Sequence, residues 1–211
     1  MYRFQNRKFY NRSEINFLDK EKKVRDFIKA KSKRLSTKLK RLWVSEYSDY
    51  DNFYYCCVQK TASQWLRSVL NDPILYRYTG MGILPYRTLG LNEAENISPF
   101  PRRRIITHLY VNYDTYVSIA KSGNYRTFFV MRDPRDAVVS WYFSARYSHK
   151  LVYPIPEMRS QLKKKNLTDG LIYIIDKLQE FGYFYALESW AESGEKIFRF
   201  EDISNNHTIF L

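Results

Sequence analysis

Cysteine and histidine are scarce in this chain, which leaves little from which to build a metal centre or a disulfide framework. Its 211 residues include two cysteines, the adjacent Cys56 and Cys57, and three scattered histidines, His108, His149 and His207. Neighbouring residues of a strand point to opposite faces, so these cysteines make a poor disulfide and are expected in the core of a protein from a reducing compartment. A reactive thiol pair is the less favoured alternative, because burial raises the pKa of a thiol. The sequence gives no support for a structural or catalytic metal.

Long apolar runs are also missing. No run approaches the roughly 20 residues that cross a bilayer, and Met1–Arg12 lacks the apolar core of a signal peptide. Hydrophobic residues make up 45% of the chain and aromatic residues 18%, which favours a folded protein over a disordered one. We therefore expect a soluble, cytoplasmic protein with one catalytic or binding domain.

The net charge of +13 is concentrated at the N-terminus. Residues 1–43 hold 15 of the 35 basic side chains but only four of the 22 acidic ones, which leaves 20 basic against 18 acidic residues in 44–211. Between Ser13 and Leu42 there is no proline or glycine, and apolar residues recur at helical spacing at Val24, Phe27, Ile28, Leu35, Leu39 and Leu42.

This pattern predicts a basic helical arm, residues 1–45, that packs on a domain of residues 46–211 with its charged face in solvent. An arm that binds an anionic membrane surface or nucleic acid is the alternative. Acidic residues interspersed along the arm argue against nucleic acid as a partner: Glu14, Asp19, Glu21 and Asp26.

Beyond the arm, strands and helices alternate along the sequence. The expected strands are Phe53–Val58, Arg104–His108, Arg126–Met131 and Lys196–Phe200. The expected helices are Ser63–Asn71, Asn112–Ser122, Pro134–Ser148, Thr168–Leu178 and Phe184–Glu192. Apolar strands separated by helices indicate an α/β fold with three α/β/α layers around a central parallel sheet, with ligands bound at the carboxyl ends of the strands. Pro73 and Asn92–Pro101 are interpreted as surface connections, and Tyr153–Asn166 as a mobile flap.

Two segments, Phe53–Leu70 and Phe128–Tyr142, run from an apolar strand through a polar turn into an amphipathic helix. The first turn of a helix has unpaired N–H groups at the positive end of its dipole, so such a turn is suited to holding phosphate. Two such turns predict a ligand with two anionic ends. The turn around Lys60 lacks the glycines of G-x-x-x-x-G-K-[ST], which disfavours ATP or GTP hydrolysis.

Four segments together resemble the cytosolic type of sulfotransferase. Gln59-Lys60-Thr61-Ala62-Ser63-Gln64-Trp65-Leu66 is similar to the family's Pro-Lys-Ser-Gly-Thr-Thr-Trp-Leu. Arg132-Asp133-Pro134-Arg135-Asp136, with Ser140 eight residues after Arg132, matches the second signature. Thr107-His108-Leu109 resembles the Thr-His-Leu of the catalytic base, and Arg199-Phe200-Glu201-Asp202-Ile203 the Tyr-Glu-Asp strand end, with Trp190 upstream. The resemblance covers about residues 52–203, and it implies a fold like that of P-loop nucleotide-binding proteins.

The resemblance also implies a chemistry. A sulfotransferase of this kind moves a sulfuryl group from 3′-phosphoadenosine 5′-phosphosulfate, its co-substrate, to a hydroxyl or amine of a small molecule or carbohydrate, without a metal. By this match Lys60 would stabilise the leaving phosphate, and Thr61, Ala62, Ser63, Gln64 and Trp65 would hold the 5′ end. Arg132 and Ser140 would hold the 3′-phosphate. His108 would be the general base, since imidazole titrates near neutral pH.

Three departures from the family pattern bear on this interpretation. Ala62 stands where the family usually has glycine, which requires a negative φ or some strain. Ile106 occupies a position that is often lysine. Family members also continue into a segment with an Arg-Lys-Gly element that grips the 3′-phosphate, whereas this sequence stops nine residues after Asp202, so we expect a version shortened at its C-terminus. The alternatives are a catalytically silent nucleotide-binding remnant and a binding module that acts through its basic arm.

Overall fold

A computed structural model describes residues 44–85, 91 and 99–205 of the chain. Its centre is a sheet of five parallel strands in the order β2-β3-β1-β4-β5. The strands are β1 (Asn52–Cys57), β2 (Gly82–Pro85), β3 (Arg104–Leu109), β4 (Tyr125–Met131) and β5 (Lys196–Arg199). Because β1 lies between β3 and β4, the chain segments that leave β1 and β4 emerge side by side at the carboxyl end of the sheet.

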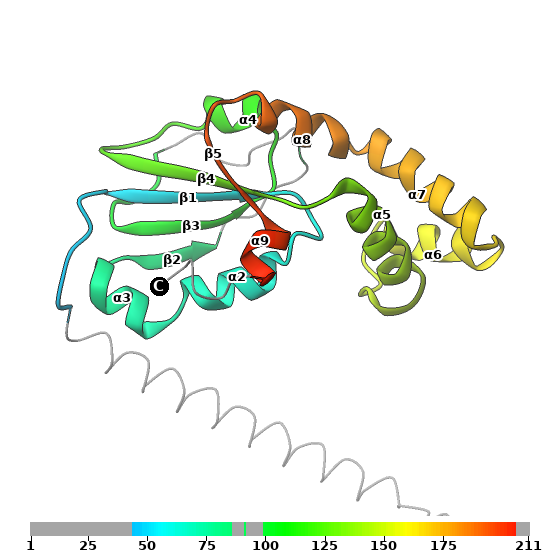
Figure 1. Cartoon of the computed structure of the whole chain (residues 1–211), viewed down its shortest axis with the longest axis horizontal. Coiled ribbons are helices and arrows are strands. Elements are labelled where there is room, and N and C mark those ends of the chain that lie inside the picture. The colour runs from blue at the N-terminus through cyan, green and yellow to red at the C-terminus, as the bar shows by residue number, and fades with distance from the viewer. Residues whose placement is uncertain (1–43, 86–90, 92–98, 206–211) are drawn as a thin grey trace, which may run out of the picture.

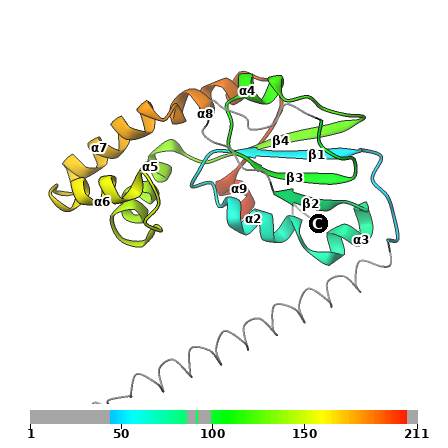
Figure 2. The same ribbon diagram turned by 180° about the vertical axis from the view of Figure 1, so that it is seen from behind.

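Helices cover both faces of this sheet and its carboxyl end (Figures 1 and 2). They are α2 (Ser63–Leu70), α3 (Pro73–Thr79), α4 (Tyr113–Ser118), α5 (Pro134–Phe143), α6 (Ile155–Lys163), α7 (Leu167–Glu180), α8 (Tyr183–Ala191) and α9 (Phe200–Asn205). A π-helical turn, η1 (Ser144–Ser148), continues α5. Figure 1 shows α5, α6 and α7 grouped beyond the end of the sheet at which β4 leads into α5. The predicted α/β architecture with a parallel sheet is confirmed.

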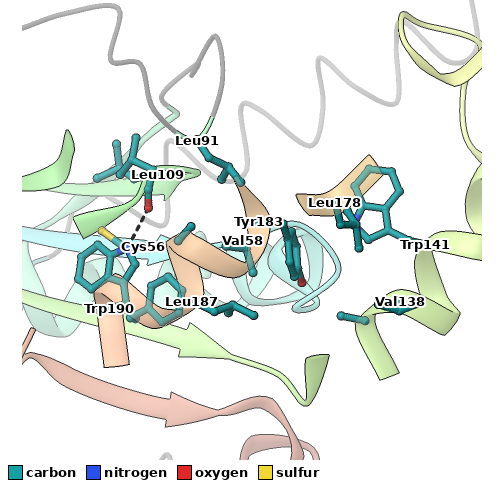
Figure 3. Close-up of a cluster of buried hydrophobic side chains, with 14 of the residues drawn as sticks. Cys56, Val58, Leu91, Leu109, Val138, Trp141, Leu178, Tyr183, Leu187 and Trp190 are labelled. Atoms are coloured by element: carbon teal, nitrogen blue, oxygen red, sulfur yellow. Dashed lines mark hydrogen bonds between the residues drawn. The ribbon is translucent and has the colours of Figure 1, made fainter. Parts of the chain in front are cut away.

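Strand β1 supplies side chains to two separate cores. Tyr54 and Cys56 belong to the larger apolar cluster, which Trp190 of α8 joins by stacking on Phe129 with ring centroids 4.8 Å apart. In Figure 3 Cys56 and Leu109 lie beside Trp190, whose indole Nε1–H donates to the carbonyl of Val111 over 2.8 Å.

Tyr55 and Cys57 point the other way, into a smaller cluster with Leu66 of α2 and Ile203 of α9. Both cysteines are free and buried, on opposite faces as predicted.

Four of the predicted strands and five of the predicted helices are present with shifted ends. The helix expected over Asn112–Ser122 stops at Ser118, and Lys121 Nζ donates to the carbonyl of Tyr116 in its last turn over 2.5 Å and to that of Ile119 just beyond it over 2.8 Å. The strand expected to include Phe200 ends at Arg199, and Phe200 begins α9 instead.

The prediction of a mobile flap over Tyr153–Asn166 is wrong, because this segment contains α6. Pro156 stands in the first turn of this helix, where a missing N–H costs nothing. The helix buries Ile155, Met158 and Leu162, which fixes it to the domain.

The region after Pro73 is also helical rather than a surface connection. Pro73 opens α3, and the Asp72 side chain caps that helix by accepting from the N–H of Ile74 over 2.7 Å. Strand β2 was not predicted at all. The predicted helices of the basic arm, residues 13–42, and most of the predicted connection Asn92–Pro101 lie outside the described residues.

Candidate anion-binding site

The turn after β1 is held in an unusual backbone conformation. Lys60 and Ala62 have φ angles of 71° and 55°, in the left-handed region that favours glycine. Between them the buried Thr61 hydroxyl donates to the carbonyl of Val58 over 2.8 Å, which closes the turn. A second hydrogen bond comes from another element: the Tyr183 hydroxyl of α8 donates to the carbonyl of Gln59 over 3.0 Å. Ala62 therefore takes the strained conformation rather than the negative φ that would avoid it.

Helix α2 begins directly after this turn, at Ser63. Ala62 occupies the N-cap position and provides no side-chain hydrogen bond, so the side chain leaves the N–H groups of the first turn uncapped. Such N–H groups are suited to anion oxygens.

The turn after β4 is stabilised in a different way. Asp133 caps α5 by accepting from the N–H of Arg135 over 2.9 Å, and Pro134 fills the first helical position. The Arg135 guanidinium is exposed and also donates to the Asp133 carboxylate over 2.6 Å, which lowers the pKa of Asp133 to about 2. Glu201 Oε1, at the start of α9, accepts from the N–H of Asp133 over 2.9 Å. The Arg135 side chain is thus paired within its own turn, whereas the Arg132 side chain contacts the other turn.

Arg132 joins the two turns. Its Nη1 donates to the carbonyl of Lys60 over 3.1 Å, across 72 positions of sequence. The parallel pairing of β1 and β4, in which Cys57 lies opposite Val130, brings these residues together at the sheet edge. The guanidinium also lies over the ring of Phe200, 4.9 Å from its centroid, so the start of α9 fixes its position.

One cavity of about 500 Å³ lies between the two turns. Its lining comes from both turns, from α5 and from the segments after β3 and η1: Gln59, Lys60, Ala62, Ser63, Gln64, Tyr110, Arg132, Ser140, Trp141 and His149. Two cations and three hydroxyl groups face this space, and its lining includes no carboxylate. Burial, followed by the charge of Arg132, lowers the pKa of Lys60. An unbalanced pair of cations among hydrogen-bond donors is the arrangement that binds an anion.

The predicted site residues therefore fall into four groups, of which His108 is the last. The cavity lining includes Lys60, Ala62, Ser63, Gln64, Arg132 and Ser140. Thr61 belongs to the same turn, but its hydroxyl is used within the turn. Trp65 lies outside the cavity lining, in an apolar groove of about 520 Å³ between α2, α3, α9 and the sheet, with Val69, Phe198 and Ile203.

His108 lies behind the cavity rather than in its lining. It is 8% exposed at the carboxyl end of β3, with its ring 4.7 Å from that of Tyr110. Its Nε2 is 3.5 Å from Nε2 of Gln64, which itself lines the cavity, and its Nδ1 is buried without a hydrogen-bond partner. Burial, with a smaller effect from Arg67, lowers the pKa of His108, so the imidazole is neutral and able to accept a proton at neutral pH.

Three aromatic residues of the cavity have no role assigned from the sequence. The hydroxyl of Tyr110 shares a hydrogen bond of 2.6 Å with that of Ser63, which orients the first turn of α2. Trp141 follows Ser140 on α5, and Lys60 Nζ lies 5.2 Å from its ring centroid. His149 stacks on Trp141 at an interplanar angle of 13°. Tyr110 lies two residues after His108 and Trp141 directly follows Ser140, so both could have been suspected from their closeness to predicted site residues. No sequence pattern points to His149.

Within residues 44–85, 91 and 99–205, no cluster of histidine, cysteine and carboxylate side chains is suited to holding a metal ion. In the same part of the chain, no helix combines the length and the apolar character that crossing a membrane requires.

The chain resembles known proteins in its structure but not in its sequence. Neither a protein family nor a curated protein matches the sequence. Among solved structures, mouse sulfotransferase SULT7A1 complexed with PAP is similar, with 16% sequence identity and a TM-score of 0.46. The similarity covers 80% of this chain and 58% of the mouse structure, so the chain spans less than two thirds of that protein's length.

Proposed function

We propose that this protein is a sulfotransferase that uses 3′-phosphoadenosine 5′-phosphosulfate as its donor. The observation that carries the proposal is the meeting of Lys60 and Arg132, from two separate strand-to-helix turns, in one cavity without carboxylates. A donor with phosphate groups at its 3′ and 5′ ends matches two cationic turns. The motifs of both turns follow one another in the same order as in cytosolic sulfotransferases, which favours this donor over other dianions.

Four residues of the cavity bind the donor in this proposal. Lys60, with Ser63 and the uncapped N–H groups of α2, holds the 5′-phosphosulfate. Arg132 and Ser140 hold the 3′-phosphate, for which the planar guanidinium of arginine is well suited because two of its N–H groups can meet two oxygens.

The reaction is an in-line displacement. The acceptor oxygen or nitrogen forms a bond to sulfur while the bond between sulfur and the bridging phosphate oxygen breaks, and 3′-phosphoadenosine 5′-phosphate leaves. The acceptor's proton passes to His108, whose lowered pKa keeps it in the basic form at neutral pH. The charge that develops on the leaving phosphate is stabilised by the Lys60 ammonium.

The acceptor is a hydroxyl or amine of a small molecule or carbohydrate. Gln64 and Tyr110 lie between His108 and the cavity, so they would contact the acceptor as its proton is lost. These two residues separate His108 from the cavity. This separation is compatible with a role as general base, because the contacts of catalytic residues often tighten when substrates bind.

The same distance favours a second candidate function. Since His108 does not line the cavity, a protein that binds the nucleotide without turnover would have the same geometry. The two candidates differ only in transfer, so binding and transfer must be measured separately.

Calorimetric titration with 3′-phosphoadenosine 5′-phosphate tests the binding. We expect Lys60→Ala and Arg132→Ala each to weaken binding by about 10- to 100-fold, as for the loss of a charge-assisted hydrogen bond. Arg135→Ala is the matched control, because this arginine is exposed and paired with Asp133 outside the cavity. Equal affinities in wild type and both cavity variants would refute the proposal.

Transfer of labelled sulfate from the donor to a panel of phenols, alcohols, amines and sugars tests the chemistry. We expect His108→Ala to abolish transfer while nucleotide affinity stays within about twofold, since general-base catalysis contributes roughly 10²- to 10⁴-fold. Full activity in His108→Ala would remove this residue from the mechanism. Tight nucleotide binding without transfer to any acceptor would support the silent candidate.

A further inference from the structure

We propose that Trp141 is a positioning residue that holds the Lys60 ammonium in the cavity in place of a carboxylate counter-ion. The proposal deepens the proposed function, because it concerns the same Lys60, and it adds a residue to which neither the sequence motifs nor the comparisons assign a role. The ring face of Trp141 and Lys60 Nζ are 5.2 Å apart at the centroid, within the range of a cation–π interaction.

The indole ring is fixed in place. Trp141 is only 9% exposed, and Figure 3 shows it beside Leu178 of α7 and Val138 of α5 in the larger apolar cluster. It lies one residue after Ser140 on α5, so the helix that supplies one predicted anion ligand also supplies the platform for Lys60. A side chain packed in this way costs little further ordering when it meets a cation.

His149 adds a second aromatic layer to this platform. Its ring lies nearly parallel to the indole, with centroids 6.0 Å apart. The segment that carries it is anchored by Arg159 of α6, which donates to the carbonyl of His149 over 2.7 Å and to that of Ala145 over 2.8 Å. The helix that replaced the predicted flap thus stabilises the wall of the cavity.

Electrostatics explains why an aromatic ring suits this position. Lys60 loses hydration on burial and is repelled by Arg132, both of which disfavour its charged form. A nearby carboxylate would favour the charged form of Lys60. It would also repel an incoming dianion and compete with it for the ammonium. The face of an indole ring attracts a cation through its quadrupole and carries no net charge. It can therefore support Lys60 in the empty cavity and leave the cation available to phosphate.

The titratable groups that face Lys60 across the cavity are Arg132 at the end of β4, Tyr110 after β3 and His149 after η1. None of these is a carboxylate. Loss of the indole face would therefore leave the ammonium without compensation, so its pKa would fall further below that of free lysine.

The first test needs no ligand. Lysine side chains of the full chain are labelled by reductive ¹³C-methylation, the Lys60 resonance is assigned by its absence in Lys60→Met, and its pKa is followed by NMR. We expect Trp141→Leu to lower this pKa by about one unit and Trp141→Phe to restore most of the loss, as for a partly buried cation–π pair. An unchanged pKa in Trp141→Leu would overturn the proposal, whether or not a nucleotide binds.

The second test is a double-mutant cycle with 3′-phosphoadenosine 5′-phosphate. Trp141→Leu in the wild-type background should weaken binding by about 5- to 30-fold, with a larger loss as pH rises because more Lys60 is then neutral. In the Lys60→Met background the same change should have little effect. Equal losses in both backgrounds would show that Trp141 acts by packing alone and would refute the proposal.

The two tests also separate this inference from the proposed function. If wild type does not bind the nucleotide at all, the proposed function fails, while the NMR measurement still decides the role of Trp141. If Trp141→Leu does not fold, uniform incorporation of 5-fluorotryptophan weakens the ring quadrupole without removing the ring. The Lys60 pKa should then fall relative to the unlabelled protein, and an unchanged value would overturn the proposal.

Discussion

The replacement of Ala62 by glycine tests the backbone strain in the turn after β1. Ala62 has φ 55° and ψ 30°, a left-handed conformation that its Cβ disfavours. Glycine has no such penalty and is also an acceptable N-cap residue. Gly194 also has a positive φ, +75°, and an added Cβ there would meet no atom within 4 Å. Gly194→Ala is thus the matched reverse change, free of steric clash.

The size of the effect follows from two opposing terms. A left-handed conformation costs a residue with a Cβ roughly 1–2 kcal/mol, and glycine removes this cost. Glycine also has more freedom in the unfolded chain, which offsets about 0.4–1 kcal/mol of the gain. We expect Ala62→Gly to raise the free energy of unfolding by about 0.5–1 kcal/mol, and Gly194→Ala to lower it by a similar amount.

Urea unfolding followed by circular dichroism measures both variants, with the free energy taken at constant m-value. The midpoint temperature should move in the same directions, by about 2–4 °C for each kcal/mol in a protein of this size. If Gly194→Ala is destabilising as expected but Ala62→Gly is destabilising too, strain at Ala62 does not describe this turn. The contacts of the alanine methyl group would then outweigh its conformational cost.

Three further predictions concern the site and its supports. Replacing Tyr183 with phenylalanine removes the hydrogen bond to the carbonyl of Gln59 and should lower the free energy of unfolding by about 1 kcal/mol in urea titration; an unchanged midpoint would mean that water replaces the bond. Arg132→Lys retains the charge but loses the planar fork, so nucleotide affinity should fall by about tenfold by calorimetry, and wild-type affinity would exclude a two-oxygen contact. Burial depresses the pKa of His108, so protons bind the unfolded chain more tightly and stability should decline as pH falls below about 6.5. The urea midpoint should therefore drop less between pH 7.5 and 5.5 in His108→Gln than in wild type.

Much of the fold follows from sequence pattern, because the strands that form the centre of the sheet are apolar runs bounded by polar turns. Strand β1 is fully apolar after Asn52, and it is buried on both faces. Strand β2 has only four residues, Gly82–Pro85, and was missed because so short a run has no periodicity to detect. Helices α3 and α6 lie where a surface connection and a flap were predicted, although both have proline in their first turn, as is typical of a helix start.

The site was predictable where spacing along the chain coincides with neighbours in space. Lys60 and Ser63 are neighbours through one turn, and Ser140 lies in the helix that begins two residues after Arg132. The contact between Arg132 and the carbonyl of Lys60 depends on the strand order, in which β4 lies next to β1. The position of Trp65 in the apolar groove and that of His149 on Trp141 depend on how helices pack, and no spacing rule encodes them.

The adjacent cysteines of β1 provide the protein with two natural reporters of local opening. Cys56 lies in the larger cluster and Cys57 in the smaller one, and burial raises the pKa of both thiols, that of Cys57 to about 12. Each thiol should react with an alkylating reagent only when its own layer opens. If the two layers separate from the sheet at different rates, peptides labelled at a single cysteine will accumulate first; if the domain opens in one step, doubly labelled peptides will appear from the start.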